Sequence, residues 1–353
     1  MSLINTLMQP LREEYSGRYD KNESRPSRYG AFDFMVQDGQ RPNSIFSEDV
    51  RNKIRNSFGN SVQIPVLDSK DVVISNVRSC TITDDENNSA LVTLAFVTYA
   101  FGFTMYPAQF KNNDIGYQAD FNRKLNDRLI KFAATLDAQS VATFENNKNE
   151  YWTDIAQYYP QVGNALQVSA AEANDYYNNL QAIKETMDFY DDTMVVSSTS
   201  GSPLVRRLDA QGAGNGINEN FQISPYSWMW SNRIINGGGI RSTQFAITEG
   251  STAIETRIDP DSEFGHSVGE QIEWSAVNVP LPNSPSSVQM GSLYREDCVD
   301  ASGIQTPNTG VAGLTASLRQ SFQWSVDMVF AVAYNSDPAA RYSPIMKVEL
   351  SAT

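Results

Sequence analysis

The sequence is poor in the residues on which most enzyme mechanisms depend. Its 353 residues include a single histidine, and 27 Lys and Arg residues are outnumbered by 41 Asp and Glu residues, which gives a formal net charge of −14. Any Ser-His-Asp or Cys-His mechanism would have to use His266. Because the residues around His266 read as a loop, we assign it no catalytic role.

Cysteine is equally scarce. Cys80 and Cys298 lie far apart, and neither has a second Cys or His at zinc-binding spacing, so we expect two buried thiols in a reducing compartment. A chain of this length can bury a large core, as one domain or two interlocked ones, without disulfides. The sequence also lacks a signal-peptide pattern and a long apolar run, so we expect a soluble protein made in the cytoplasm, with no membrane span.

Three patterns come near a ligand site without completing one. The acidic stretch 259–270 approaches the EF-hand pattern, but Phe264 stands where that loop needs glycine. The glycine-rich stretches 211–216 and 236–239 match neither the dinucleotide nor the P-loop pattern. The adjacent carboxylates of Asp191 and Asp192 should point in different directions and face solvent. We therefore predict no catalytic residue, metal or cofactor.

The negative charge is concentrated in the second half of the chain. Residues 1–60 carry nine basic and eight acidic side chains, whereas residues 161–353 carry ten basic and 21 acidic ones. Phosphate recognition needs clustered Lys and Arg, so this half is not suited to tight nucleic-acid binding.

The first hundred residues predict extended structures with little core of their own. Residues 1–45 read as a polar arm, rich in helix breakers at 20–28. Ser47 to Phe58 is expected to be a short helix, with Ser47 as its N-cap and an apolar stripe formed by Val50, Ile54 and Phe58. Residues 62–107 predict a β-ribbon that cannot be stable alone. Arm and ribbon should therefore pack on neighbouring molecules.

The rest of the chain predicts a mixture of helices and strands. An apolar stripe at helical spacing predicts a helix over 118–147, about 40 Å long. A second helix is expected over 170–190, capped by Ser169 with Glu172. The remaining predictions are strands at 193–198, 271–279 and 322–334, and a short helix from Ser202-Pro203 through Asp209.

This order of elements resembles that of the major capsid proteins of tailed bacteriophages with the HK97-like fold. Leu125 to Gln139 is similar to the spine helix of that family, and Met194 to Leu204 is similar to the strand and helix of its axial domain. The resemblance implies an α+β fold with an N-terminal arm (1–45), a short helix and extended β-ribbon loop (46–117), the spine helix of a peripheral domain (118–154), an α/β axial domain (155–320), and a strand returning to the peripheral domain with the C-terminus (321–353).

The function implied by the resemblance is structural, not enzymatic. Such a protein self-assembles into hexamers and pentamers of an icosahedral shell that encloses double-stranded DNA without sequence specificity. The implied partners are further copies of the chain, a portal protein and a scaffolding protein, with decoration proteins left open, and no cofactor or membrane is implied. The region before residue 30 is short for a built-in scaffolding extension, so a separate scaffolding protein is expected. The location would be the virion shell, assembled in the host cytoplasm.

Charged residues in and beside the ribbon are the candidates for contacts between subunits. They are Arg51, Lys53, Arg55, Lys70, Arg78, Asp84, Asp85 and Glu86. We expect Arg51, Lys53, Arg55 and Arg78 to make salt-sensitive contacts with acidic neighbours. Some members of the family crosslink through a lysine of the extended loop. Lys53 and Lys70 are the lysines near this loop, and we do not expect a crosslink here.

Other functions remain open on the sequence alone. A shell of the encapsulin type would share the fold and carry an enzyme as cargo. A β-rich binding module of a virion tail or cell surface would suit the strand-rich second half, which contains many Asn and Ser residues. An enzyme of another type would lack an evident catalytic centre.

Overall fold

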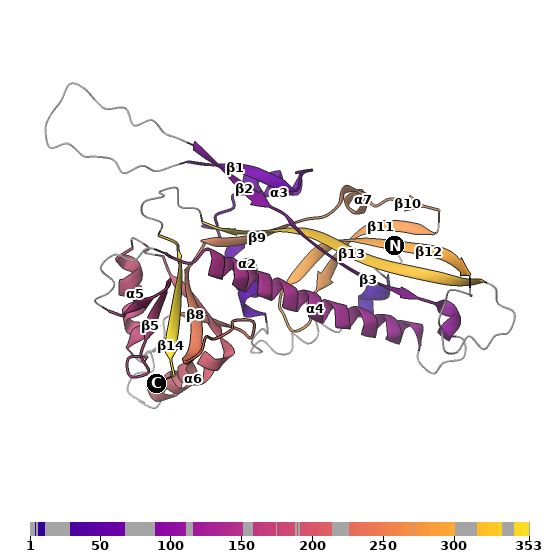
Figure 1. The fold of residues 1–353 in the computed structure, drawn as a ribbon. Helices are drawn as coiled ribbons and strands as arrows, with labels where there is room; N and C mark the ends of the chain where they lie inside the picture. The colour runs from indigo at the N-terminus through magenta and orange to yellow at the C-terminus, as the bar shows by residue number, and fades with distance from the viewer. Residues whose placement is uncertain are drawn as a thin grey trace, which may run out of the picture. The chain divides into compact units, whose positions relative to one another are not determined.

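The computed structural model describes residues 4, 6–10, 29–67, 89–110, 116–150, 158–173, 175–187, 189, 191–213, 226–269, 271–300, 316–333 and 342–352 (Figure 1). The chain divides into two compact units. The first unit takes in residues 1–29, 96–138 and 255–329, and the second takes in 30–95, 139–254 and 330–353. The long helix α4, Tyr117–Asn146, contributes to both, and it confirms the helix predicted over 118–147.

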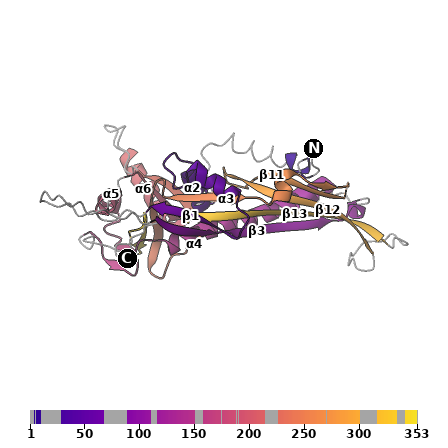
Figure 2. The ribbon, with the colours of Figure 1, turned by 90° about the horizontal axis from the view of Figure 1, so that it is seen from above.

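The first unit is built on a six-stranded sheet. Its strand order is β10-β11-β12-β13-β3, with β9 also paired to β13. The strands are β3 (Val97–Met105), β9 (Thr252–Arg257), β10 (Ser267–Val268), β11 (Ile272–Pro280), β12 (Ser287–Asp300) and β13 (Ala316–Val332). The predicted strands at 271–279 and 322–334 are therefore present. Figures 1 and 2 both show β3 beside β13, and the two strands pair antiparallel from Met105 with Gln320 to Val97 with Met328.

One face of this sheet is aromatic and lies against α4. Phe322 and Trp324 of β13 are fully buried, because Phe121 of α4 and Phe101 and Phe103 of β3 pack on them with ring centroids 5.1 to 6.5 Å apart. Leu125 and Leu129 continue the buried stripe along α4. The period of two in β13 and the period near 3.6 in α4 are thus the patterns that the sequence shows.

The second unit contains a sheet of six strands in the order β4-β5-β14-β8-β6-β7 and a separate two-stranded ribbon, β1-β2. The bounds are β1 (Ser61–Leu67), β2 (Ser89–Ala95), β4 (Gln161–Val162), β5 (Ala165–Val168), β6 (Thr193–Ser198), β7 (Ser227–Ser231), β8 (Ile240–Thr248) and β14 (Ile345–Ser351). The helices are α2 (Gly30–Gly39), α3 (Glu48–Arg55), α5 (Tyr176–Glu185) and α6 (Ser202–Ala213). Short turns of 3-10 helix lie at η1 (Pro107–Phe110) and η3 (Thr199–Gly201), and helix α7 of the first unit spans Pro260–Phe264.

Both faces of the six-stranded sheet in the second unit are covered. One core joins α5 and α6 to side chains such as Val195 and Ala246, and the other joins α2 and the end of α4 to Val196 and Phe245. Consecutive residues of one strand therefore belong to different cores. This explains why β6 is buried at all six positions.

Helix α2 contradicts the prediction that residues 1–45 form a polar arm. Eight of its ten residues are buried, among them Phe32, Phe34 and the charged Asp38. The carboxylate of Asp38 accepts hydrogen bonds from the Gly250 and Thr252 amides and from the Thr252 hydroxyl, at 2.6 to 2.9 Å. A carboxylate that ties two distant segments together in this way cannot be recognised from local sequence.

Two further boundaries differ from prediction. Ser169 does hydrogen-bond Glu172, at 2.8 Å, but the helix begins only at Tyr176, because residues 169–173 form turns. Strand β11 pairs with β12, and β12 pairs with β13, so these strands belong to the first unit, whereas the prediction places residues 155–320 in one domain with β6 and β8. Strands β12 and β13 pair over ten residues, from Gly291 with Ser325 to Asp300 with Ala316, and this pairing assigns β12 to the sheet of the first unit.

Candidate assembly interface

The ribbon has one buried and one exposed face. Because β1 and β2 pair antiparallel, with Val62 opposite Leu94 and Pro65 opposite Leu91, residues of the same parity share a face. Val62 and Ile64 are buried on one side. On the other side Pro65 is exposed, and Leu91 is exposed by 63%. The exposed face thus carries apolar area with no formal charge along its described length, an arrangement typical of protein contact surfaces.

Helix α3 precedes the ribbon and begins as predicted. The hydroxyl of Ser47 accepts a hydrogen bond from the Val50 amide at 3.4 Å. Glu48 and Asp49 lie in the first turn, where their negative charges interact favourably with the positive end of the helix dipole. The helix ends at Arg55, one turn earlier than expected. Phe58 therefore does not join the core stripe with Ile54, and it is exposed by 91%.

The predicted interface residues that the structure describes lie on α3. The Arg51 guanidinium donates to the carbonyls of Phe46, at 3.2 Å, and Gly39, so it braces the start of its own helix. The Lys53 ammonium is exposed and donates to the Gln63 carbonyl of β1, at 2.6 Å. The Arg55 guanidinium is about half exposed, 3.9 Å from the Glu48 carboxylate. Lys70, Arg78, Asp84, Asp85 and Glu86 lie outside the described residues.

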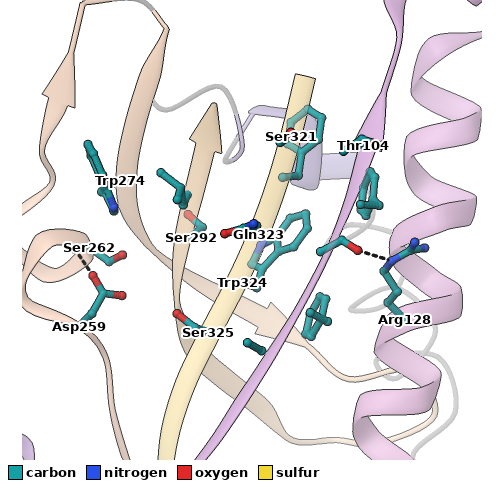
Figure 3. A pocket seen from close by; sticks show the side chains of 16 residues that line it. Thr104, Arg128, Asp259, Ser262, Trp274, Ser292, Ser321, Gln323, Trp324 and Ser325 are labelled. Atoms are coloured by element: carbon teal, nitrogen blue, oxygen red, sulfur yellow. Dashed lines mark hydrogen bonds between the residues drawn. The ribbon is translucent and has the colours of Figure 1, made fainter. Parts of the chain in front are cut away.

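The sheet of the first unit has a second, polar face with a groove of about 730 Å³ (Figure 3). Along β13, the aromatic residues that face α4 alternate with polar residues that face the groove, which are Ser321, Gln323 and Ser325. The opposite wall carries Trp274 and the side chains of Asp259 and Ser262 at the start of α7.

Close packing fixes the α7 wall of the groove. Asp259 caps α7 by accepting the Ser262 amide at 2.8 Å. A Cβ at Gly291 would lie 2.3 Å from the Asp259 carboxylate, so a larger residue at that point of β12 would have to displace the Asp259 and Ser262 side chains. The groove is therefore lined by both polar and aromatic side chains, with the Asp259 carboxylate and the Arg128 guanidinium as its charged groups.

Cationic side chains of α4 cover the outer edge of β3. The Arg128 guanidinium donates to the Gly102 carbonyl at 2.8 Å, and it lies 5.0 Å from the Phe103 ring centre. The Lys124 ammonium lies 3.4 Å from the Thr104 carbonyl. These contacts satisfy carbonyls that would otherwise invite pairing with a foreign strand. In the sequence, Arg128 and Lys124 are only charged residues next to the apolar stripe of the helix, and their contacts with β3 cannot be recognised there.

Two polar networks, one half-buried and one buried, involve titratable groups. In the first unit, Tyr117 donates to Gln320 at 2.5 Å, and Gln320 donates to Tyr294 at 2.9 Å and to Glu296 at 2.8 Å. Burial and the Glu296 charge raise the pKa of Tyr117 to about 12, and burial, with the hydrogen bond to Glu296, raises the pKa of Tyr294 well above its ordinary value. These phenols therefore stay protonated at neutral pH and act as donors.

The second network holds a buried cation in the second unit. The Lys184 side chain of α5 donates to the Thr193 hydroxyl at 2.6 Å and lies 3.4 Å from the Asp191 carbonyl. Burial lowers its pKa to about 8, against the opposing charges of Asp191, Asp192 and Glu249. Nothing in the sequence near Lys184 indicates that its ammonium is buried.

His266 and Cys298 are the remaining candidates for chemistry that the structure describes. His266 is exposed, with its ring 4.0 Å from the Asp261 carboxylate. Cys298 is exposed, so its predicted burial was wrong: it lies where β12 and β13 run on as a two-stranded hairpin with less cover. Cys80 and Glu270 lie outside the described residues. Within the described ranges no group of three or more His, Cys, Asp or Glu side chains could hold a metal, and no helix is long and apolar enough to span a membrane.

The comparisons with known proteins rest on structure. No protein-family model and no curated protein matches the sequence. The structure is similar to a capsid subunit of cyanophage A-1(L), with a TM-score of 0.50, 9% identity, and coverage of 92% of this chain and 93% of that one. It also matches the capsid of Ralstonia phage GP4 (TM-score 0.49, 10% identity, 93% and 92% coverage) and a structure from Mycobacterium phage Che8 (0.45, 11%, 88% and 89%).

The similarity to the cyanophage structure extends over nearly the whole of both chains, so it concerns the complete architecture. The elements that the two units combine are a two-stranded ribbon, a long helix beside a sheet, and a separate sheet flanked by helices. The chain therefore has the HK97-like fold of tailed-phage capsid proteins, as its sequence predicts.

Proposed function

We propose that this protein is the major capsid protein of a tailed bacteriophage, and that its copies form the hexamers and pentamers of an icosahedral shell around double-stranded DNA. The shared fold with the cyanophage A-1(L) capsid subunit, over 92% of the chain, is the observation that carries the proposal. The role is structural, and chemistry at a catalytic centre has no part in it.

In this proposal each predicted region has a mechanical task. The ribbon β1-β2 is the extended loop that reaches a neighbouring subunit, and α4 with the sheet of the first unit is the peripheral domain. The two-sided sheet of the second unit is the axial domain, which closes the capsomer. Portal, scaffolding and decoration proteins would bind the assembled shell. The formal net charge of −14 disfavours tight binding of DNA, which suits a container that must release its genome.

The exposed ribbon offers a direct test. Ser61 and Ala95 lie opposite each other in the register, so a short Gly-Ser linker can replace residues 61–95 and leave the chain ends in place. The full chain should form large closed particles in negative-stain microscopy and mass photometry. The shortened chain should keep its circular dichroism spectrum and remain as single subunits or small oligomers.

Two outcomes would contradict the proposal. One is a full-length chain that remains monomeric at micromolar concentration, both alone and when co-expressed with its neighbouring genes. The other is a shortened chain that forms the same particles as the full chain.

A further inference from the structure

We propose that the turn after α3 of one copy docks on the segment around α7 of a second copy. The basic turn is defined as residues 51–60, and the acidic rim as residues 259–268. This contact rests on the proposed assembly and specifies one of the joints between subunits. Each of the two surfaces combines exposed apolar side chains with charged ones, and the charges of the two surfaces have opposite signs.

The basic turn presents an aromatic side chain beside positive charges, one of which, the Arg55 guanidinium, also lies 3.9 Å from the Glu48 carboxylate of the same helix. Phe58 is the most exposed of the large apolar side chains in the described residues, at 91%. Residues 51–60 include three cations and no acid, and the exposed Lys53 and Arg55 lie in the last turn of α3, directly before Phe58. Single exposed apolar side chains are common on protein surfaces, so the exposure of Phe58 alone does not indicate a contact site.

The acidic rim is its counterpart in the first unit. Residues 259–268 include three acids and neither Lys nor Arg, and Asp261 and Glu263 are exposed. Phe264 and Val268 of the same segment are exposed by 77% and 61%. Exposed apolar groups next to polar and charged ones match the apolar centre and polar edge of typical protein contacts.

Both surfaces are held by hydrogen bonds that fix their shape before contact. In the rim, the left-handed Gly265 (φ 69°) ends α7, and the Trp274 amide donates to the His266 carbonyl at 2.7 Å. In the turn, the Asn56 amide closes the end of α3 on the Asn52 carbonyl at 3.0 Å. Little conformational freedom is therefore lost on docking, which favours binding.

The occupant of the rim is a second copy of this chain, because of charge. Two basic turns would repel each other, as would two acidic rims, whereas turn and rim attract. Each surface is exposed within the single chain, so each is open to the other surface of a different copy. A contact between unlike surfaces is heterologous, and repeated around an axis it closes a ring.

Phe58 tests the apolar half of the contact. In Phe58→Ser the protein concentration needed for half-assembly, measured by light scattering or mass photometry, should rise about tenfold or more, as for a central contact residue. Ile235→Ser is the matched control, because Ile235 is exposed by 88% in a different loop of the second unit. It should assemble as the wild type does. Equal assembly of Phe58→Ser and wild type would overturn the inference.

A charge exchange tests the identity of the partner surface. Lys53→Glu with Arg55→Glu, and separately Asp261→Lys with Glu263→Lys, should each weaken assembly. The chain that carries all four changes should recover it, and raising the salt concentration should weaken wild-type assembly. If the fourfold variant assembles no better than the two doubles, the rim is not the partner of the turn.

These outcomes separate the contact from the proposed function. A wild-type chain that forms no particles would overturn both. Wild-type particles whose assembly ignores the Phe58 and charge variants would overturn the contact alone. Circular dichroism of each variant shows that the loss of assembly is not a loss of folding.

Discussion

The two six-stranded sheets differ in how many of their faces are buried. In β13 of the first unit, Phe322 and Trp324 are fully buried while Gln323 between them is exposed. In β6 of the second unit, all six residues are buried, because helices cover both faces. The second sheet is therefore covered on both faces. The first sheet keeps a broad polar face, with the groove and α7, exposed and available for contacts.

The closed sheet also buries polar groups, and it pairs them with one another. The Ser242 hydroxyl lies 3.2 Å from that of Ser197 and 3.1 Å from that of Ser198. A Cβ at Gly201 would lie 2.6 Å from the Ser242 hydroxyl and 2.7 Å from the Ser197 hydroxyl, so a larger residue there would disturb this hydroxyl pairing. Most buried hydroxyls in proteins are hydrogen-bonded, as these are, because an unpaired buried hydroxyl costs stability.

The largest effect should come from the centre of the one-sided sheet. Trp324→Ala removes a fully buried ring that packs on Phe101, Phe103 and Phe121, so it should lower the free energy of unfolding by about 3–5 kcal/mol. Gln323→Ala, one residue away on the open face, should change it by less than about 0.5 kcal/mol. Urea unfolding followed by circular dichroism measures both, and similar values for the pair would show that the open face is covered.

The buried cation of the two-sided unit should give a pH dependence of intermediate size. The pKa of Lys184 is about 8 in the folded chain and about 10.5 when unfolded, so the folded state binds fewer protons between these values and stability rises with pH across this window. The gain is on the order of 3 kcal/mol. Lys184→Met should remove that rise and be more stable than the wild type below pH 8. A wild-type curve that runs parallel to that of Lys184→Met from pH 8 to pH 10 would refute the burial of the charge.

A smaller effect distinguishes the two sheets most directly. Val195→Ala and Val196→Ala change consecutive residues that face opposite cores of the second unit. Each should cost about 2 kcal/mol, because each deletes two buried methyl groups and leaves a cavity. Thermal unfolding of the two variants gives the values, and one silent position would mean that β6 has an open side.

Much of the fold follows from local patterns. The helix over Tyr117–Asn146, the alternation in β13 and the Ser47 cap agree with prediction. Helical spacing and strand alternation show which residues of an element are buried, and a cap is recognised from the residues next to it. Helix α2 was missed because its burial depends on β7: a Cβ at Gly30 would lie 2.5 Å from the Trp230 carbonyl oxygen, some 200 positions away in the chain.

The candidate interface was predicted less completely. The sequence pointed to charges on and around the ribbon, among them Lys53 and Arg55, and whether they contact a neighbour stays a prediction. It placed Phe58 in a core, because a spacing of four residues cannot show that α3 ends at Arg55. The acidic stretch 259–270 reads in the sequence as an incomplete match to the EF-hand pattern, and only the structure shows its exposed Phe264 and Val268 on a fixed frame.

The sequence by itself determined the scarcity of catalytic groups, the acidic second half, and the order of ribbon, long helix and mixed α/β portion, because composition and period are local properties. Tertiary structure alone decided which strands share a sheet, which sheet has an open face, and which exposed apolar side chains stand beside which charges. Those outcomes depend on pairing between residues far apart in the chain, and no local pattern encodes that pairing.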